Sequence, residues 1–227
     1  MMSSNKPSSY LLDLVLYISV MFLVREIYFE SAHFLANGLF WSFTTLVLAT
    51  WRMRVRGVRW RDLGLCNPKS WVKCLLVSGL ILGATIASII VFEILKDQLP
   101  FAVAPDTSTE SAVSRFGNLK DNWPLFFMII PFVWLESMLE ELLDRGFLMN
   151  WFERLFSRTP IAAILAVLAQ AALFGFRHFP SHGWSGAITV SLIGLIMGAA
   201  YMLSGRNLWP LIIAHAVLNT ISMVGRV

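Results

Sequence analysis

Seven apolar segments, each close to the length of a membrane-crossing helix, make up most of this 227-residue sequence. The hydrocarbon core of a bilayer requires about 20 apolar residues in helical form. Backbone polar groups in lipid must be paired within their own segment, which excludes open strands. The sequence therefore predicts an all-α fold, a polytopic transmembrane helical bundle with about seven or eight membrane-embedded helices, as one integral-membrane domain over residues 1–227. The expected spans lie near residues 10–24, 34–51, 71–94, 124–151, 159–178, 186–203 and 208–224.

The composition supports a membrane protein and excludes other classes. Hydrophobic residues form 57% of the chain and charged residues only 14%, which is too apolar for a soluble domain of this size. The formal net charge is +4, but the basic residues concentrate in the connections between apolar segments, as in other membrane proteins. The lipid bilayer, and not a nucleic acid, is therefore the expected partner. Cys66 and Cys74 show no CxxC spacing and predict neither a disulfide framework nor a zinc site.

The distribution of Lys and Arg predicts the orientation. Twelve of the 18 basic residues fall on the side of the spans that holds the N-terminus, and the more basic side is cytoplasmic. We therefore expect a multi-pass integral membrane protein with a cytoplasmic N-terminus, in the plasma membrane if the source is bacterial. The remaining six basic residues are Arg25, Lys96, Arg115, Lys120, Arg177 and Arg226.

The run "LEELLDRGF" places four charges inside an otherwise apolar span. Charges at bilayer depth cost several kcal/mol unless they are paired or face a protein interior. Glu141 and Arg145 are four residues apart on one helical face, so they predict a structural ion pair. Glu140 instead has acidic neighbours at this spacing, Glu136 and Asp144, and such a setting suits a carboxyl group that exchanges protons at working pH. The alternative for Glu140 is a carboxyl group bound by polar groups of another span.

Two later spans carry polar residues that their surroundings do not require. His178 lies just before the helix-breaking Pro180, and His215 and Asn219 share a face of the last span. Each could be a hydrogen bond between helices. With Glu140 they also form a coherent set for hydrolysing an amide bond, which needs a base to activate water, a group that holds the water and donors for the oxyanion.

The depth of these residues decides whether they can meet. At 1.5 Å per residue, Glu140 lies roughly 16 Å from the cytoplasmic end of its span, and His215 and Asn219 lie roughly 10 and 16 Å from that side. His178 lies roughly 28 Å from the same side. Convergence therefore requires the span that carries His178 to tilt or to break early.

Taken together, the three motifs resemble the CPBP family, which comprises the type II CAAX prenyl proteases and their bacterial relatives, also called Abi proteins. The resemblance extends over about residues 50–224, and it implies a catalytic core of helices within residues 124–224. Asp144 departs from the family pattern, in which a bulky apolar or aromatic residue precedes the arginine. The matching positions are Glu140, Glu141 and Arg145 for EExxxR, Phe174 and His178 for FxxxH, and His215 and Asn219 for HxxxN.

This resemblance implies a membrane-embedded, glutamate-dependent endopeptidase that needs no cofactor. The implied substrate is a membrane-associated peptide or protein, either a prenylated CAAX-type tail or a bacteriocin or other secreted peptide. The implied roles are water activation by Glu140, water binding by His178, oxyanion stabilisation by His215 and Asn219, and structural support by Glu141, Arg145 and Phe174.

Two alternatives use the same polar residues. One is a zinc metalloprotease with Glu140 or Glu141 and the three histidines of the later spans as ligands, although Pro180 argues against a helical clamp between His178 and His182. The other is a non-enzymatic immunity or transport protein that binds a partner or an ion through these buried groups.

Overall fold

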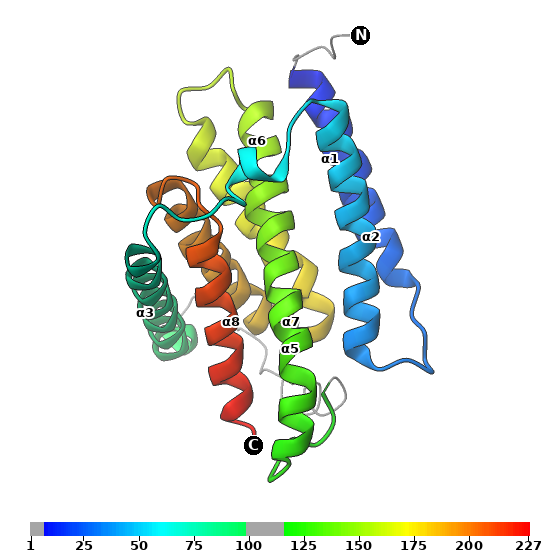
Figure 1. Ribbon diagram of the computed structural model, residues 1–227, viewed down its shortest axis with the longest axis vertical. Helices are drawn as coiled ribbons and strands as arrows, with labels where there is room; N and C mark the ends of the chain where they lie inside the picture. The colour runs from blue at the N-terminus through cyan, green and yellow to red at the C-terminus, as the bar shows by residue number, and fades with distance from the viewer. Residues whose placement is uncertain (1–6, 99–115) are drawn as a thin grey trace.

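The chain folds into a bundle of helices, shown by a computed structural model that describes residues 7–98 and 116–227 (Figure 1). No strand occurs within these two ranges, so the predicted all-α fold is confirmed. The elements are α1 (Pro7–Leu23), η1 (Val24–Glu26), α2 (Phe34–Val55), η2 (Trp60–Leu63), α3 (Trp71–Leu95), η3 (Lys96–Gln98), α5 (Trp123–Glu141), η4 (Leu142–Met149), α6 (Asn150–Leu155), α7 (Ala162–Leu203) and α8 (Trp209–Val224).

Five helical stretches are long and apolar enough to cross a membrane, and they confirm five of the seven predicted spans. The other two predicted spans are also helical: α5 continues through η4 into α6, and α8 is a shorter apolar helix of 16 residues. Large apolar side chains remain exposed on the outside of the bundle, as lipid contact requires. The five stretches are Pro7–Glu26, Phe34–Val55, Trp71–Gln98, Ala162–Pro180 and His182–Leu203.

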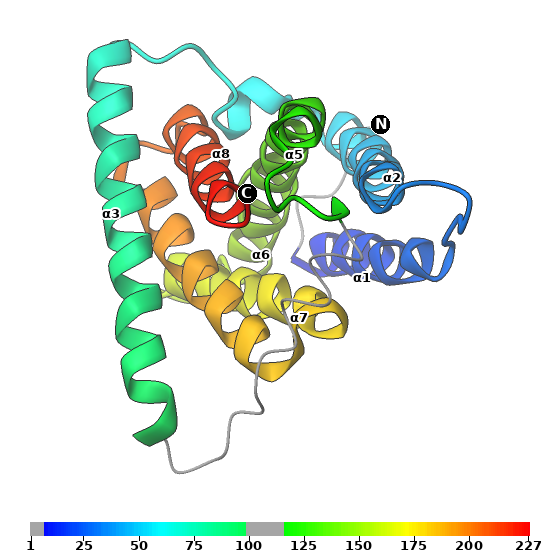
Figure 2. The same cartoon turned by 90° about the horizontal axis from the view of Figure 1, so that it is seen from below.

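Helix α7 consists of two halves that meet at a sharp break. Gly183 has φ 63° and ψ −170°, a backbone conformation that glycine adopts without steric cost. Pro180, three residues earlier, lacks the backbone N–H that a continuous helix would use. Figure 2 shows the two halves diverging from the break, and the first half lies across the view whereas α5 and α8 are seen nearly end-on. The first half is therefore strongly tilted relative to α5.

The continuous helix α5–η4–α6 runs through the middle of the bundle, with α8 and α2 against α5 and with α7 against η4. Its central part, η4, is a π-helix in which every residue is buried. The wider π-helical register leaves carbonyl groups without their usual partners. The Asn150 side chain compensates, because its Nδ2 donates to the carbonyl oxygens of Arg145 at 3.0 Å and Gly146 at 2.8 Å.

A buried ion cluster ties the first helices to the centre at the end of the bundle where α1 begins. Asp13 of α1 is 1% exposed and accepts hydrogen bonds from Arg52 of α2 and from Arg56, which directly follows that helix. The indole Nε1 of Trp151 in α6 donates to the same carboxylate at 3.1 Å. Asp13 is thus a paired charge, which explains how an apolar span accommodates it.

Candidate active site

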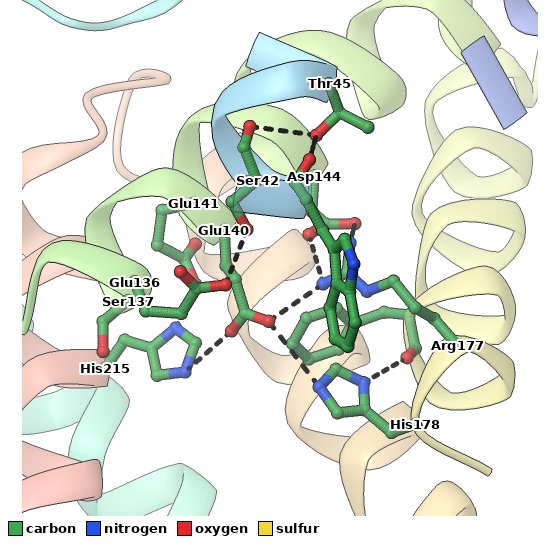
Figure 3. Close-up of polar contacts among 12 residues, drawn as sticks. Ser42, Thr45, Glu136, Ser137, Glu140, Glu141, Asp144, Arg177, His178 and His215 are labelled. Carbon is green, nitrogen blue, oxygen red and sulfur yellow. Dashed lines mark hydrogen bonds and ion pairs between the residues drawn. The ribbon is translucent and has the colours of Figure 1, made fainter. Parts of the chain in front are cut away.

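Side chains from three helices converge on the carboxylate of Glu140 (Figure 3). Glu140 lies in the last turn of α5, and its Oε1 is 3.6 Å from Nε2 of His178 in the first half of α7. Its Oε2 is 3.6 Å from Nε2 of His215 in α8. The sequence left this convergence open, and the structure brings His178, near the end of the tilted first half of α7, into contact distance of Glu140.

His178 is held by its own helix. Its Nδ1 lies 2.7 Å from the carbonyl oxygen of Phe174, one turn earlier, and the ring packs edge-on against the Phe174 ring at 4.9 Å. A carbonyl oxygen can only accept a hydrogen bond, so Nδ1 carries the proton and donates it. In the neutral imidazole, Nε2 is then an acceptor that faces Glu140.

His215 is held from behind by a buried ion pair. Its Nδ1 donates to Oε1 of Glu141 at 2.7 Å, and Nη1 of Arg145 donates to the same oxygen at 2.9 Å. Neither Glu141 nor Arg145 has any exposed side-chain surface. The ion pair predicted from the i,i+4 spacing is therefore confirmed. Because Nδ1 is engaged, Nε2 of His215 can donate a hydrogen bond only when both ring nitrogens are protonated.

Asn219 lies one turn beyond His215 in α8 and borders the same cavity as Glu140. Its Nδ2 donates to the hydroxyl of Ser137 in α5 at 2.9 Å. This contact is of the kind required by the alternative in which Asn219 only joins two helices. Its role as an oxyanion donor stays a prediction.

Arg177 is a site residue that the sequence analysis missed. Its Nη2 donates to Oε1 of Glu140 at 3.1 Å and to Oδ2 of Asp144 at 3.0 Å. Counting Arg177 among the basic residues on the side of the spans opposite the N-terminus was wrong, because its side chain is only 4% exposed and lies in the site. The available signals were a basic residue within an apolar run, next to His178, and the unusual acid at Asp144.

The acidic neighbours of Glu140 along α5 had indicated a wholly acidic environment. The structure shows that a basic side chain also lies beside it. The guanidinium of Arg177 adds a positive charge on one side, and Asp144, with no exposed side-chain surface, holds that guanidinium in place. The departure from the family motif at Asp144 thus has a local structural reason, since Asp144 provides the buried partner that Arg177 needs.

Phe174 supports the site through its ring. The guanidinium carbon of Arg145 lies 4.7 Å from the ring centroid, and that of Arg177 lies 5.0 Å from it. Both distances are within the range of attractive cation–π contacts. Phe174 therefore links the two arginines that hold Glu141 and Glu140, in addition to accepting the hydrogen bond from His178.

A cavity of about 450 Å³ gives access to these groups. Glu140, Arg177, His178, His215 and Asn219 all line it, whereas Glu141 and Arg145 lie behind it. A volume of this size accommodates a few side chains of a peptide. Its aromatic lining residues are Phe22, Phe34, Trp41, Phe116 and Phe174.

The zinc alternative requires several donor side chains arranged around one point. Within residues 7–98 and 116–227, no group of three or more His, Cys, Asp or Glu side chains is arranged to hold a metal ion. His182, which that alternative required, has its ring centroid 5.8 Å from that of His178 and also borders the cavity. The independence of the protein from a metal stays a prediction.

A helical membrane bundle with this arrangement of a carboxylate and two imidazoles is the architecture expected of an intramembrane peptidase. Residues 122–221, which include α5 to α8 and all three motifs, match the family model described as type II CAAX prenyl endopeptidase Rce1-like. The match covers just under half of the 227 residues, and it supports the membership of the CPBP family that the motifs predicted. This match is to a family of peptidases, and together with the apolar helices it supports an integral membrane protein. No curated protein and no solved structure matches the chain.

Proposed function

We propose that the protein is an intramembrane endopeptidase that hydrolyses a peptide bond of a membrane-associated protein or peptide with a water molecule activated by Glu140. The observation that carries this proposal is the position of the Glu140 carboxylate between Nε2 of His178 and Nε2 of His215, in one cavity. The 3.6 Å separations allow a water molecule to contact the carboxylate and an imidazole at about 2.8 Å each.

In this mechanism Glu140 accepts a proton from the water as the water oxygen attacks the carbonyl carbon of the substrate. Nε2 of His178 accepts the second hydrogen of the water in a hydrogen bond and so fixes its direction. As the tetrahedral intermediate collapses, the C–N bond breaks and Glu140 returns its proton to the leaving amine. Arg177 holds the Glu140 carboxylate in the orientation that both transfers require.

The intermediate carries a negative oxygen that needs hydrogen-bond donors. His215, in its doubly protonated form, donates from Nε2, and Asn219 donates from its side-chain amide. Glu141 and Arg145 keep the His215 ring in position from behind. Glu140, His178, His215, Asn219 and Arg177 thereby each have a part in the reaction or in its geometry.

The direct test is a mass-spectrometric comparison of membrane peptides from cells that contain the wild-type protein or the Glu140→Ala variant. We expect new peptide termini that appear only with the wild type, because the variant lacks the carboxylate that activates water in the proposed reaction. Identical sets of termini at equal protein levels would show that the proposed activity is absent.

We expect Asn219→Ala to reduce kcat by about 100- to 1000-fold with little change in KM or melting temperature, because the amide acts on a charge that develops only in the transition state. The measurement is the rate per folded molecule, determined with a peptide from the comparison above. Ser137→Ala removes the same hydrogen bond from the other side and should have a much smaller effect on kcat. A normal rate in folded Asn219→Ala protein would remove Asn219 from the site.

We also expect purified, active protein to contain no stoichiometric zinc and to keep its activity in a chelator, because Glu140 and the two histidines suffice for the proposed reaction. The measurement is elemental analysis together with the cleavage rate before and after chelation. One tightly held zinc per active chain, or activity lost on chelation and restored by zinc, would instead favour the metalloprotease alternative.

A further inference from the structure

The cavity at Glu140 lies toward the end of the bundle opposite the start of α1. It is lined by the end of α1 with η1, the first part of α2, the part of α5 up to Glu140, α7 on both sides of its break, and α8 from His215 onward, together with Phe116. In Figure 1 the start of α1 is at the top and its end lies near mid-height, whereas the starts of α2 and α5 and the end of α8 lie in the lower half. The exposed lining residues Glu26, Ser222 and Arg226 mark the mouth at that lower end.

The other side of the site is closed by packed side chains. None of residues 141–173, all of which the structure describes, lines the cavity. Residues 141–151 are buried without exception. Tyr201 and Leu208 are also fully buried beside them and add to the same layer. A substrate can therefore reach Glu140 from the lower end but not from the end where α1 begins.

The structure also sharpens the charge argument for orientation, because Arg145 and Arg177 belong to the buried site and to neither surface. When these two residues are left out of the count, the end where α1 begins still has a clear excess of basic residues. The more basic end of a membrane protein is cytoplasmic. Among the described residues, that end carries Arg52, Arg54, Arg56, Arg59, Arg61, Lys69, Lys73, Arg154, Arg158 and Arg206. The opposite end carries Arg25, Lys96, Lys120 and Arg226.

We propose that the candidate active site opens on the extracytoplasmic face, so that its substrate is an exported peptide or a membrane-protein segment that lies on that face. A peptide presented from the cytoplasm, including a prenylated cytoplasmic tail, could not reach Glu140 in this arrangement. The substrate class rests on the proposed peptidase function, whereas the sidedness of the cavity does not. The aromatic mouth, where Arg25 stacks over Trp41 at 5.3 Å, suits an apolar segment near the membrane surface.

The sidedness can be tested with single cysteines in a Cys66→Ser, Cys74→Ser background, expressed in a bacterial host. Ser222 is exposed at the mouth, and Ser157 is exposed between α6 and α7 at the opposite end. A membrane-impermeant maleimide added to intact cells should label the Ser222→Cys variant, whereas it should label the Ser157→Cys variant only after permeabilisation. Labelling of Ser157→Cys in intact cells, or of Ser222→Cys only after permeabilisation, would overturn the proposal.

A second measurement does not depend on these variants. Alkaline phosphatase fused after Val227 should be active, because the enzyme folds only outside the cytoplasm and α8 ends at the same end of the bundle as the cavity mouth. A second fusion carries a fluorescent protein at the same position. If the phosphatase fusion is inactive and the fluorescent fusion matures, the orientation is the opposite of the one assigned, and the proposal is contradicted.

The activity measurement separates this inference from the proposed function. Attaching a bulky maleimide to the Ser222→Cys variant from outside should eliminate most of the Glu140-dependent cleavage, while the modified Ser157→Cys variant should retain it. If the cleavage is blocked only by a maleimide that reaches the cytoplasmic face, the proposed sidedness is refuted, whereas the proposed peptidase function is not. The expected labelling without any Glu140-dependent cleavage would refute the peptidase and leave the sidedness intact.

Discussion

Replacing Glu140 with glutamine is expected to abolish peptide hydrolysis while the protein remains folded. Glutamine has nearly the same shape and keeps an acceptor oxygen for Arg177, but it cannot accept a proton from water. Loss of a general base lowers turnover by about 100- to 10,000-fold. Turnover and melting temperature should be measured on the same detergent-solubilised sample, so that the chemical effect is separated from any loss of folded protein.

Glu136 provides a matched control for this experiment. It lies one turn earlier in α5 and accepts a hydrogen bond from Ser42 at 2.6 Å, which a glutamine oxygen can also accept. We therefore expect Glu136→Gln to lose far less activity than Glu140→Gln. Equal losses in both variants would argue against a special role for Glu140. Full biological activity in Glu140→Gln cells would favour the non-enzymatic alternative.

The parts of this site that were predictable from sequence lie within single helices. The Glu141–Arg145 pair follows from a spacing of four residues, which fixes the two side chains on one face whatever the rest of the fold does. The five confirmed spans follow equally from length and apolar composition. The contact between Glu140 and His178 could not be predicted in the same way. It depends on the tilt of the first half of α7, and apolar composition does not determine that tilt.

The features that sequence did not reveal depend on contacts between helices or on helical register. Asp144 and Arg177 are 33 residues apart, and each alone resembles an isolated charge in an apolar span. The π-helix η4 has no signature in apolar periodicity, and the hydrogen bonds that Asn150 donates to the Arg145 and Gly146 carbonyls become visible only in the structure. Both features determine how the groups around Glu140 are held.

Replacing Arg145 with alanine is expected to lower stability strongly, in contrast to Glu140→Gln. Arg145 is the buried ionic partner of Glu141, and its removal leaves a carboxylate without surface exposure to water. Breaking one side of a buried ion pair costs about 3–5 kcal/mol, and Glu141 would keep only His215 as a partner for its buried charge. The measurement is thermal or denaturant unfolding in detergent, with Glu140→Gln analysed in parallel.

The cause of that loss can be resolved with a second substitution. In the Arg145→Ala background, Glu141→Gln removes the uncompensated charge and should restore part of the stability, because the two residues are energetically coupled. If the double variant is no more stable, the loss comes instead from the packing of the guanidinium against Phe174, 4.7 Å from its ring centroid. Equal losses of stability in Arg145→Ala and Glu140→Gln would contradict the division between a supporting pair and a reacting carboxylate. If the division is correct, the folded protein tolerates the loss of the Glu140 charge, because Glu140 borders the cavity. It does not tolerate the loss of one charge of the buried Glu141–Arg145 pair.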